Sequence, residues 1–419
     1  MNAPQRKGWC PSLMRPMASG DGLLVRIKPP AGRLTVAQAE TVANAARAHG
    51  NGIIDLTNRG NLQVRGLTDA DVPKFAEVVV GCGLAVPDPD AEGARTILVD
   101  ALGPDDPEAR GDSHALGLVI EKQIVETPEL HALPGKFGFL VDAGVLMPSF
   151  APATDVEIRS YGGAWRISLD GCAETVLVDT PEAAALAAKR LASAFVSRIA
   201  ERRGVIRRMR DVAGKRGGPD LFEAAGLSCS ETQPPRSPER APPVGFVAHD
   251  GSDIGAFVAA APFGQIDAER LEGLARLAGE FGDGTLRMTA WKALALTGVA
   301  REAAEGLAAQ ASSMDMVVEA NDPRRRIFAC AGWPACSSST VETRADAARI
   351  AEIDAEFEGV IHISGCSKGC AHPSPCALTL VGHDGLYDLV RSGRADAAPW
   401  LTNQHLSDVV ERLRAEARS

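Results

Sequence analysis

Two segments of this 419-residue chain, 23–67 and 256–299, align with each other when one gap is allowed in the first loop. In each segment the pattern indicates an apolar strand, an amphipathic helix of about thirteen residues, a G-x-G turn and two short strand-like runs. Chance similarity of two β-α-β units is the alternative, but the matched glycines and threonines weigh against it. The repeat therefore predicts two half-domains that enclose a site at a pseudo-twofold axis. The aligned pairs include Leu34 with Ile266, Gly50 with Gly282, Gly52 with Gly284, Thr57 with Thr289, Leu62 with Leu294, and Gly66 with Gly298.

Further α/β material follows each repeat. After the first, 94–102 and 138–146 have the pattern of strands, 165–171 and 174–180 that of a hairpin, and 181–203 that of a long helix. After the second, 338–357 is helical in pattern and 359–365 strand-like, so Cys366 should lie just past a strand end. Residues 229–245 contain five prolines and have the composition of an extended linker. The predicted units are 18–70, 88–228, 246–302 and 320–395.

The composition excludes some classes of function. A formal charge of −10 without a long basic run argues against nucleic acid or a membrane surface as the main partner. No apolar stretch approaches the roughly 20 residues that span a bilayer. The first residues lack the apolar region of a secretory signal. We therefore expect a cytoplasmic protein with no membrane or nucleic-acid partner.

Nine cysteines need an explanation, because disulfides are rare in the cytoplasm. Four are paired in sequence: Cys330 with Cys336 as C-x5-C, and Cys366 with Cys370 as C-x3-C. An iron–sulfur cluster takes four thiolates and tolerates irregular spacing. Zinc remains an alternative although its knuckles usually have shorter spacings, and so does the absence of any metal. The five others are expected to be small buried hydrophobes or incidental thiols: Cys10, Cys82, Cys172, Cys229 and Cys376.

The repeat, "CAGWPAC", "ETRADAARIA" and "GCSKGCAHP" together resemble the sulfite and nitrite reductase family, which pairs a 4Fe-4S cluster with a sirohaem. The resemblance covers about Gly20 to Arg391. It implies an α+β (α/β) fold in which duplicated ferredoxin-like half-domains share a pseudo-twofold sheet, each followed by a reductase-type α/β domain. It also implies that the cluster ligands are Cys330, Cys336, Cys366 and Cys370.

The same resemblance suggests residues that face a tetrapyrrole. "TNRGNLQVR" keeps Arg59 and Gln63 of the family's pattern and adds Arg65, "ARTILVDA" supplies Arg95, and "LPGKFGF" supplies Lys136. Arginine suits bidentate pairing with a carboxylate. For any one of these residues a surface salt bridge is the ordinary alternative. The predicted substrate-binding residues are Arg59, Gln63, Arg65, Arg95, Lys136 and Lys292.

Three departures separate the chain from the sulfite reductases. Gly138 stands where the family has a second lysine, Gly60 replaces a glutamine, and the second repeat has "TAWK" ending at Lys292. With the N-terminal "KGWCPSLMRPMASGDGLLVRI", these look like the precorrin-3B synthase branch of the family. That resemblance implies O2-dependent hydroxylation of precorrin-3A at C20 with γ-lactone formation, electrons passing through the cluster, and a mononuclear non-haem iron. It implies no sirohaem, and Gly138 would leave room for the edge of the macrocycle.

Several features have no readable assignment. No G-x-G-x-x-G lies between a strand and a helix, so electrons should come from a separate reductase that uses NADH or NADPH. The eight histidines show no iron-binding pattern, and for His372 a structural hydrogen bond is the ordinary alternative to an iron ligand. The basic run 202–211 has the pattern of a solvated helix face. A sirohaem-dependent reductase and a non-catalytic tetrapyrrole carrier remain as other hypotheses, although a carrier would not need four paired cysteines.

Overall fold

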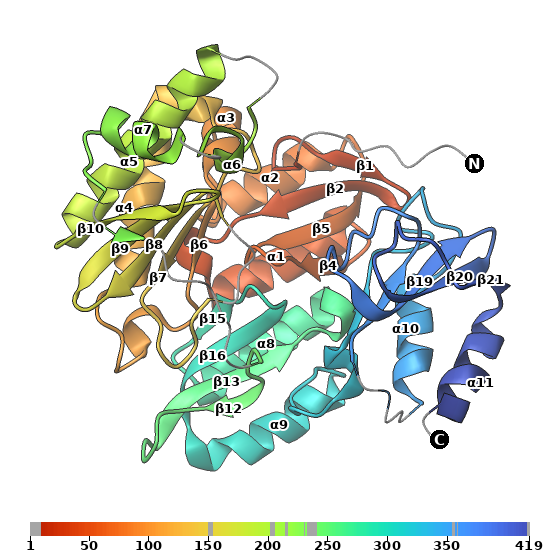
Figure 1. The fold of residues 1–419 in the computed structure, drawn as a ribbon. Coiled ribbons are helices and arrows are strands. Elements are labelled where there is room, and N and C mark those ends of the chain that lie inside the picture. The colour runs from red at the N-terminus through yellow and green to blue at the C-terminus, as the bar shows by residue number, and fades with distance from the viewer. Residues whose placement is uncertain are drawn as a thin grey trace.

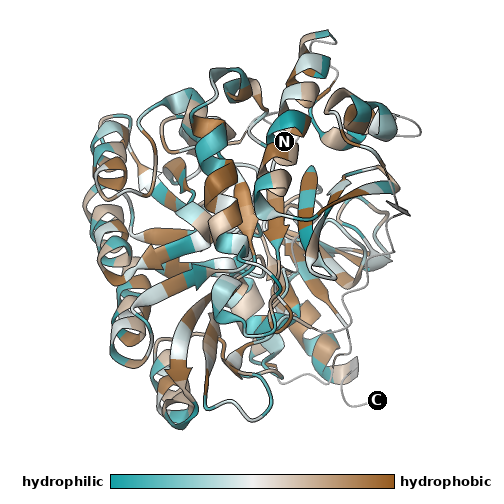
Figure 2. Ribbon diagram, turned by 90° about the vertical axis from the view of Figure 1, so that its left-hand side faces the viewer, coloured by the Kyte–Doolittle hydropathy of each residue, from teal (hydrophilic) through white to brown (hydrophobic). Residues whose placement is uncertain are grey.

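The computed structural model describes residues 10–149, 154–201, 206–213, 217–229, 231–232, 241–353, 357 and 359–416. In these residues the strands form four sheets, two in the half-domains and two in the α/β parts (Figure 1). Hydrophobic residues concentrate on the interior strands, whereas the peripheral helices carry both hydrophobic and hydrophilic residues (Figure 2). No helix among the described residues is long and apolar enough to cross a membrane.

The two half-domains exchange an edge strand. In the first half-domain sheet the order is β1 (Met17–Ser19), β2 (Gly22–Ile27), β5 (Leu62–Leu67), β4 (Ile53–Leu56) and β14 (Gln265–Asp267). In the second it is β12 (Gly245–Val247), β13 (Ile254–Ala260), β16 (Ala293–Ala300), β15 (Thr285–Met288) and β3 (Arg33–Thr35). The predicted sharing therefore takes the form of two sheets that each borrow one strand.

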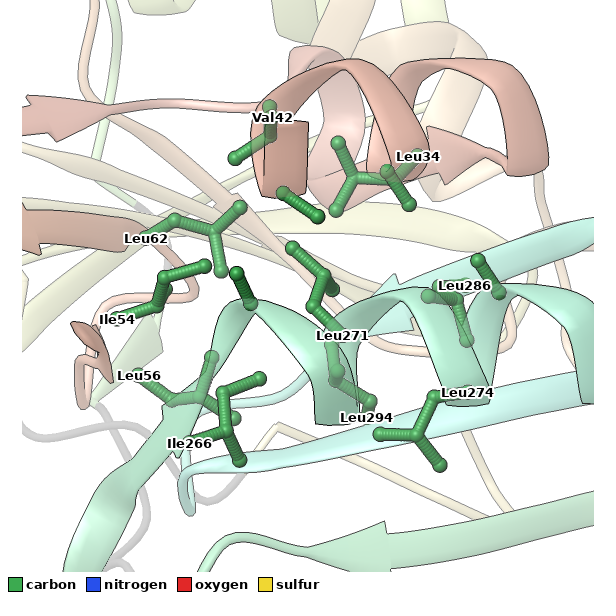
Figure 3. Packing of buried hydrophobic residues seen from close by; sticks show 14 of the residues in the cluster. Leu34, Val42, Ile54, Leu56, Leu62, Ile266, Leu271, Leu274, Leu286 and Leu294 are labelled. Atoms are coloured by element: carbon green, nitrogen blue, oxygen red, sulfur yellow. The ribbon is translucent and has the colours of Figure 1, made fainter. Parts of the chain in front are cut away.

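The duplicated helices pack against each other between these sheets. Helix α1 (Val36–His49) begins at a capping box in which the Thr35 hydroxyl accepts from the Gln38 N–H, and α8 (Ala268–Phe281) begins where Asp267 caps Arg270. Both helices lead into a glycine turn whose second glycine has a φ of +77°, a backbone conformation that favours glycine. Leucine and isoleucine side chains from both repeats meet in one core (Figure 3). Burying each such side chain stabilises the fold by roughly 1.5–3 kcal/mol.

The first α/β sheet has the order β11-β10-β9-β8-β7-β6. Strands β6 (Ile97–Val99), β7 (Phe139–Asp142) and β8 (Val156–Tyr161) are parallel neighbours. The predicted hairpin is β9 (Ala164–Leu169) with β10 (Glu174–Val178), and the predicted long helix is α5 (Pro181–Glu201). Within the predicted linker, β11 (Glu231–Thr232) pairs with β10, while 230 and 233–240 lie outside the described residues. The remaining helices of the first part are α2 (Val72–Gly81), α3 (Pro89–Ala94), α4 (Ser113–Val125), α6 (Met209–Ala213) and α7 (Gly217–Ala224).

The second α/β sheet has the order β17-β18-β19-β20-β21, and its first three strands are parallel neighbours. One face of this sheet packs its apolar side chains against α10 and α11. The predicted helix over 338–357 is shorter in the structure, since α10 begins at Thr343 and ends at Ala351, and 354–356 lie outside the described residues. The elements are β17 (Ile327–Ala329), β18 (Ile361–Ser364), β19 (Cys376–His383), β20 (Leu386–Gly393), β21 (Leu401–Gln404), α9 (Ala304–Ser313), α10 and α11 (Leu406–Glu416).

Candidate functional site

The four paired cysteines lie at the carboxyl edge of the second α/β sheet. Cys330 directly follows β17, and the loop with Cys366 and Cys370 follows β18. Because β17 and β18 are parallel neighbours, these loops meet: the Gly365 N–H donates to Cys330 Sγ at 3.2 Å. Burial raises the pKa of Cys366 and Cys370, and the nearby thiols of Cys330 and Cys336 raise it further. The two cysteine pairs thus converge on one site.

The four thiols can be compared with what a metal ion and a cluster each require. A zinc ion would draw its thiolates to about 2.3 Å from one centre. A four-iron cluster binds each thiolate to a different iron and so holds the sulfurs further apart. Four thiolates from two converging loops are the donor set that such a cluster takes.

The loop between Cys330 and Cys336 is fastened to the first half-domain. The Ala335 carbonyl accepts hydrogen bonds from Arg65 Nη2 at 2.6 Å, from the Ser19 hydroxyl at 2.5 Å and from the Gly20 N–H at 3.2 Å. Arg65 is only 2% exposed and also pairs with Asp21 through Nε at 2.8 Å. These contacts make Arg65 a support of the cysteine loop. They leave it poorly placed for substrate binding, the role that the sequence predicted for Arg65.

Asp55 on β4 joins three parts of the chain. One carboxylate oxygen accepts from Arg344 of α10 at 2.8 Å and from Gln265 of β14 at 3.1 Å. The other accepts from Arg65 at 3.1 Å and from Gln63 at 3.2 Å. The arginines lower the pKa of Asp55 although burial opposes them, so it stays ionised. Gln63, also predicted to bind substrate, belongs to this network.

Arg95 disagrees more strongly with the sequence-based prediction. Its side chain is 3% exposed and forms ion pairs with Glu92 and Glu121, and it donates to the Leu84 carbonyl at 2.8 Å. Arg95 precedes β6 as the C-cap residue of α3, and the motif could not reveal its pairing with Glu121, because Glu121 lies 26 residues away on α4. We interpret Arg95 as a structural residue that forms a buried network with Glu92 and Glu121.

Arg59 occupies a different environment. It lies in the turn between β4 and β5, and its Nη1 donates to the Lys136 carbonyl at 3.3 Å. Among the described residues it forms no ion pair, and burial together with nearby Arg208 and Arg26 lowers its pKa. Arg26 has a buried Nε, and Arg208 a buried Nη2, that lack a hydrogen-bond partner in the described structure. Of the predicted residues, Arg59 therefore retains capacity for an anion, and it lies near two arginines, Arg26 and Arg208, that were not predicted.

The two predicted lysines lie apart. The side chain of Lys136 is exposed beside Arg59. Lys292 is near Asp55, Arg344 and Cys330, and burial lowers its pKa. The structure therefore brings Lys136 to the Arg59 group and Lys292 to the cysteine site.

Comparisons with known proteins agree with this geometry. A model of the nitrite/sulfite reductase ferredoxin-like half domain matches twice, at residues 15–79 and 248–313. A precorrin-3B synthase from a Sinorhizobium species is 31% identical over 408 residues, covering 95% of this chain and 85% of that protein. The chain belongs to the nitrite and sulfite reductase family.

More distant members of this family share its architecture. A ferredoxin–nitrite reductase from Synechococcus elongatus is 24% identical over 407 residues, covering 90% of this chain and 79% of that protein. The solved structure of the NirA protein of Mycobacterium tuberculosis superposes with a TM-score of 0.70 at 17% identity, covering 94% of this chain and 80% of that one. Family membership makes the chain an oxidoreductase with the duplicated half-domain fold that the sequence predicted.

The surroundings of Gly138 show what its missing side chain makes room for. A Cβ atom at this position would lie 3.1 Å from Arg59 Nη1 and 3.2 Å from Thr96 Cγ2. The space beside Gly138 is therefore filled by the Arg59 guanidinium. The sequence predicted that this glycine makes room for the macrocycle itself, but its direct neighbour is the residue expected to bind the macrocycle.

Sequence reasoning missed Asp55 and misjudged Arg208. The isolated acid in the apolar run "IIDL" was the available signal for Asp55. The run 202–211 was predicted to be a solvated helix face; 202–205 lie outside the described residues, and Arg208 instead turns inward to pair with fully buried Asp155 at 2.9 Å. Arg210, 54% exposed and paired with Asp170, does face solvent. A charge run alone does not tell which of its members points inward.

Proposed function

We propose that this chain acts as a precorrin-3B synthase, a monooxygenase of aerobic cobalamin biosynthesis. It would hydroxylate precorrin-3A at C20 with O2 while the ring A acetate closes a γ-lactone. The observation that carries this proposal is the 31% identity to a precorrin-3B synthase over nearly the whole chain, against 24% for a nitrite reductase.

The four cysteines would hold a 4Fe-4S cluster, which supplies single electrons when bound. Monooxygenation places one oxygen atom of O2 in the product and reduces the other to water with two electrons and two protons. A separate reductase using NADH or NADPH would provide those electrons. The mononuclear non-haem iron has no counterpart among the described residues, where no three-residue ligand group occurs, so we assign it no residues and no step.

The chain's own contribution would be to hold an acidic macrocycle. A protein with a net charge of −10 can bind a ring of carboxylates only through a local group of cations. Arg59, Arg26 and Arg208 offer guanidinium groups in one neighbourhood, with Lys136 beside them. Because Arg59 has no carboxylate partner of its own among the described residues, a substrate carboxylate would add a bidentate ion pair. Lys292, near Cys330, would lie beside the cluster.

The competing hypothesis is a sirohaem-dependent sulfite or nitrite reductase, the chemistry of the family's other members. A visible spectrum of anaerobically purified protein separates the two, because sirohaem adds strong absorption beyond that of an iron–sulfur cluster. We expect iron and acid-labile sulfide without haem bands, and turnover of precorrin-3A with a reductant and O2. Bound sirohaem with sulfite or nitrite reduction would favour the competing hypothesis instead.

A further inference from the structure

His362 is a buried histidine whose ring lacks partners. It lies in the middle of the second α/β sheet, where β18 places it between Phe328 of β17 and Thr379 of β19. Its side chain has no solvent exposure, and neither Nδ1 nor Nε2 has a hydrogen-bond partner in the described structure. A buried polar group without a partner is unfavourable, because it has lost its hydrogen bonds to water. Such a residue calls for a ligand that completes it.

The surroundings of His362 belong to the cysteine site. A Cβ atom on Gly369, the residue before Cys370, would lie 3.6 Å from His362 Cε1, so the second cysteine loop folds over the ring. The ring centroids of His362 and His372 are 6.2 Å apart. Burial, with His372 and Lys292 nearby, lowers the pKa of His362 to about 4. At neutral pH the ring is therefore neutral and carries one N–H donor.

The strand register directs His362 toward the same side as a cysteine ligand. Side chains alternate along a strand, so Phe328 and Cys330 share one face of the sheet, and His362 and Ser364 share that face on the next strand. The opposite face carries the isoleucines that pack against α10. The Cys330 N–H donates to the Ile363 carbonyl at 3.2 Å, which places Cys330 beside this stretch of β18.

We propose that His362 donates a hydrogen bond to the iron–sulfur cluster, at a sulfide or at a ligand thiolate, and thereby raises the cluster's reduction potential. The inference rests on the cluster assigned under the proposed function. A hydrogen bond to sulfur favours the reduced state, because that state carries more negative charge. His372 is less suited to this role, since its Nδ1 lies 3.1 Å from both the Ser374 carbonyl and Cys376 Sγ.

Three variants test the role of His362. His362→Leu removes the donor, while His362→Gln and His362→Asn keep an N–H near the positions of Nε2 and Nδ1. His383→Leu is the matched control, because His383 lies on β19 of the same sheet and pairs with Asp388 at 2.9 Å. The midpoint potential is measured by redox titration of the holoprotein. Pulsed EPR of the reduced cluster, with ¹⁵N-labelled histidine, detects the coupled nitrogen.

We expect His362→Leu to lower the midpoint potential by roughly 59 mV, a tenfold change in the ratio of reduced to oxidised cluster. The histidine nitrogen coupling should disappear, one amide variant should restore much of the potential, and His383→Leu should behave as wild type. An unchanged potential and coupling in His362→Leu at full cluster loading would overturn this inference alone. Absence of any cluster from the wild-type protein would instead refute the assignment on which it rests.

Discussion

Each of the two α/β parts contains a loop of the same sequence pattern, with aspartates in the first part and cysteines in the second. Residues 330–336 have the pattern C-A-x-x-P-x-C, and residues 100–106 have D-A-x-x-P-x-D at the equivalent place. Asp100 directly follows β6 as Cys330 directly follows β17. The Ala143 N–H donates to Asp100 Oδ2 at 3.0 Å, just as the Gly365 N–H donates to the Cys330 sulfur.

The difference lies in what completes each loop. Asp106, the counterpart of Cys336, accepts from the N–H groups of Val145 and Leu146 at 2.8 and 2.7 Å. Backbone donors, together with His249 Nε2 at 2.9 Å from Asp106 Oδ1, thus satisfy the carboxylates of this loop within the chain. In the second part, the loop after β18 brings the thiols of Cys366 and Cys370 toward Cys336, the counterpart of Asp106. The same frame therefore makes a closed structural loop in one half and an open ligand set in the other.

A reversal of charge accompanies this difference. Arg287 on β15 is the counterpart of Asp55 in the aligned repeats. It pairs with Asp105 of the first part at 2.6 Å and lies 3.3 Å from His114 of α4, where the second part has Arg344 paired with Asp55. Each half-domain is thus fastened by a buried charge to the α/β part of the other half.

The largest loss of cluster and activity is expected when Cys330 is replaced by aspartate, the residue at the equivalent position of the first loop. Cys330→Asp should reduce iron and acid-labile sulfide to near zero and abolish turnover, because a hard carboxylate replaces one of four thiolates. The fold should persist, as judged by circular dichroism. Cys82→Ser is the control, because Cys82 is a half-buried thiol at the end of α2. This variant should keep the cluster. Full cluster content in Cys330→Asp would contradict the ligand assignment.

Replacing Asp55 and Arg287, the buried charges that fasten the two half-domains, should have different effects on the cluster. Asp55→Ala leaves Arg344 without its carboxylate partner and Arg65 with Asp21 alone, and it should destabilise the protein by about 3–5 kcal/mol, measured by denaturant unfolding. Because Arg65 supports the cysteine loop, the variant should also lose cluster on dilution. Arg287→Met should destabilise the fold while cluster retention stays normal. Equal retention in both variants would mean that Asp55 does not support the cluster loop.

Arg59 can be exchanged for its counterpart in the other repeat, Trp291. Arg59→Trp should weaken precorrin-3A binding at least tenfold, since removing one partner of a buried ion pair costs roughly 2–5 kcal/mol. The cluster spectrum should remain as in wild type. Arg210→Ala, at an exposed arginine, should bind normally. Unchanged affinity in Arg59→Trp would remove Arg59 from the proposed substrate site.

The smallest effect concerns pH and the first α/β part. Burial and nearby Asp100 raise the pKa of Asp142 to about 6, although Arg159 opposes them. The folded state therefore binds a proton between about pH 4 and pH 6 that the unfolded state has released, so stability falls as pH rises through this range. Asp142→Asn should remove about 1–3 kcal/mol of this dependence, measured by unfolding at pH 5 and pH 7. Parallel pH profiles for the two proteins would exclude this titration.

The sequence predicted what depends on spacing along the chain. The repeat, the strand ends and the convergence of four cysteines follow from local periodicity and from parallel strands that end at one edge. The partners of individual side chains did not follow, because Arg95 and Arg65 pair with Glu121 and Asp21, acids that tertiary packing brings close. The D-x5-D counterpart of the cysteine loop was visible in the sequence, since Pro104 and Pro334 align within it.

The most direct test of the account follows the oxygen atoms. Wild-type holoprotein is given precorrin-3A, a reductant and ¹⁸O2, and the product is examined by mass spectrometry. The account predicts one ¹⁸O atom per product molecule, no product without O2, and no reduction of sulfite in a parallel assay. Product formed without O2, or sulfite reduction by protein that contains sirohaem, would contradict it.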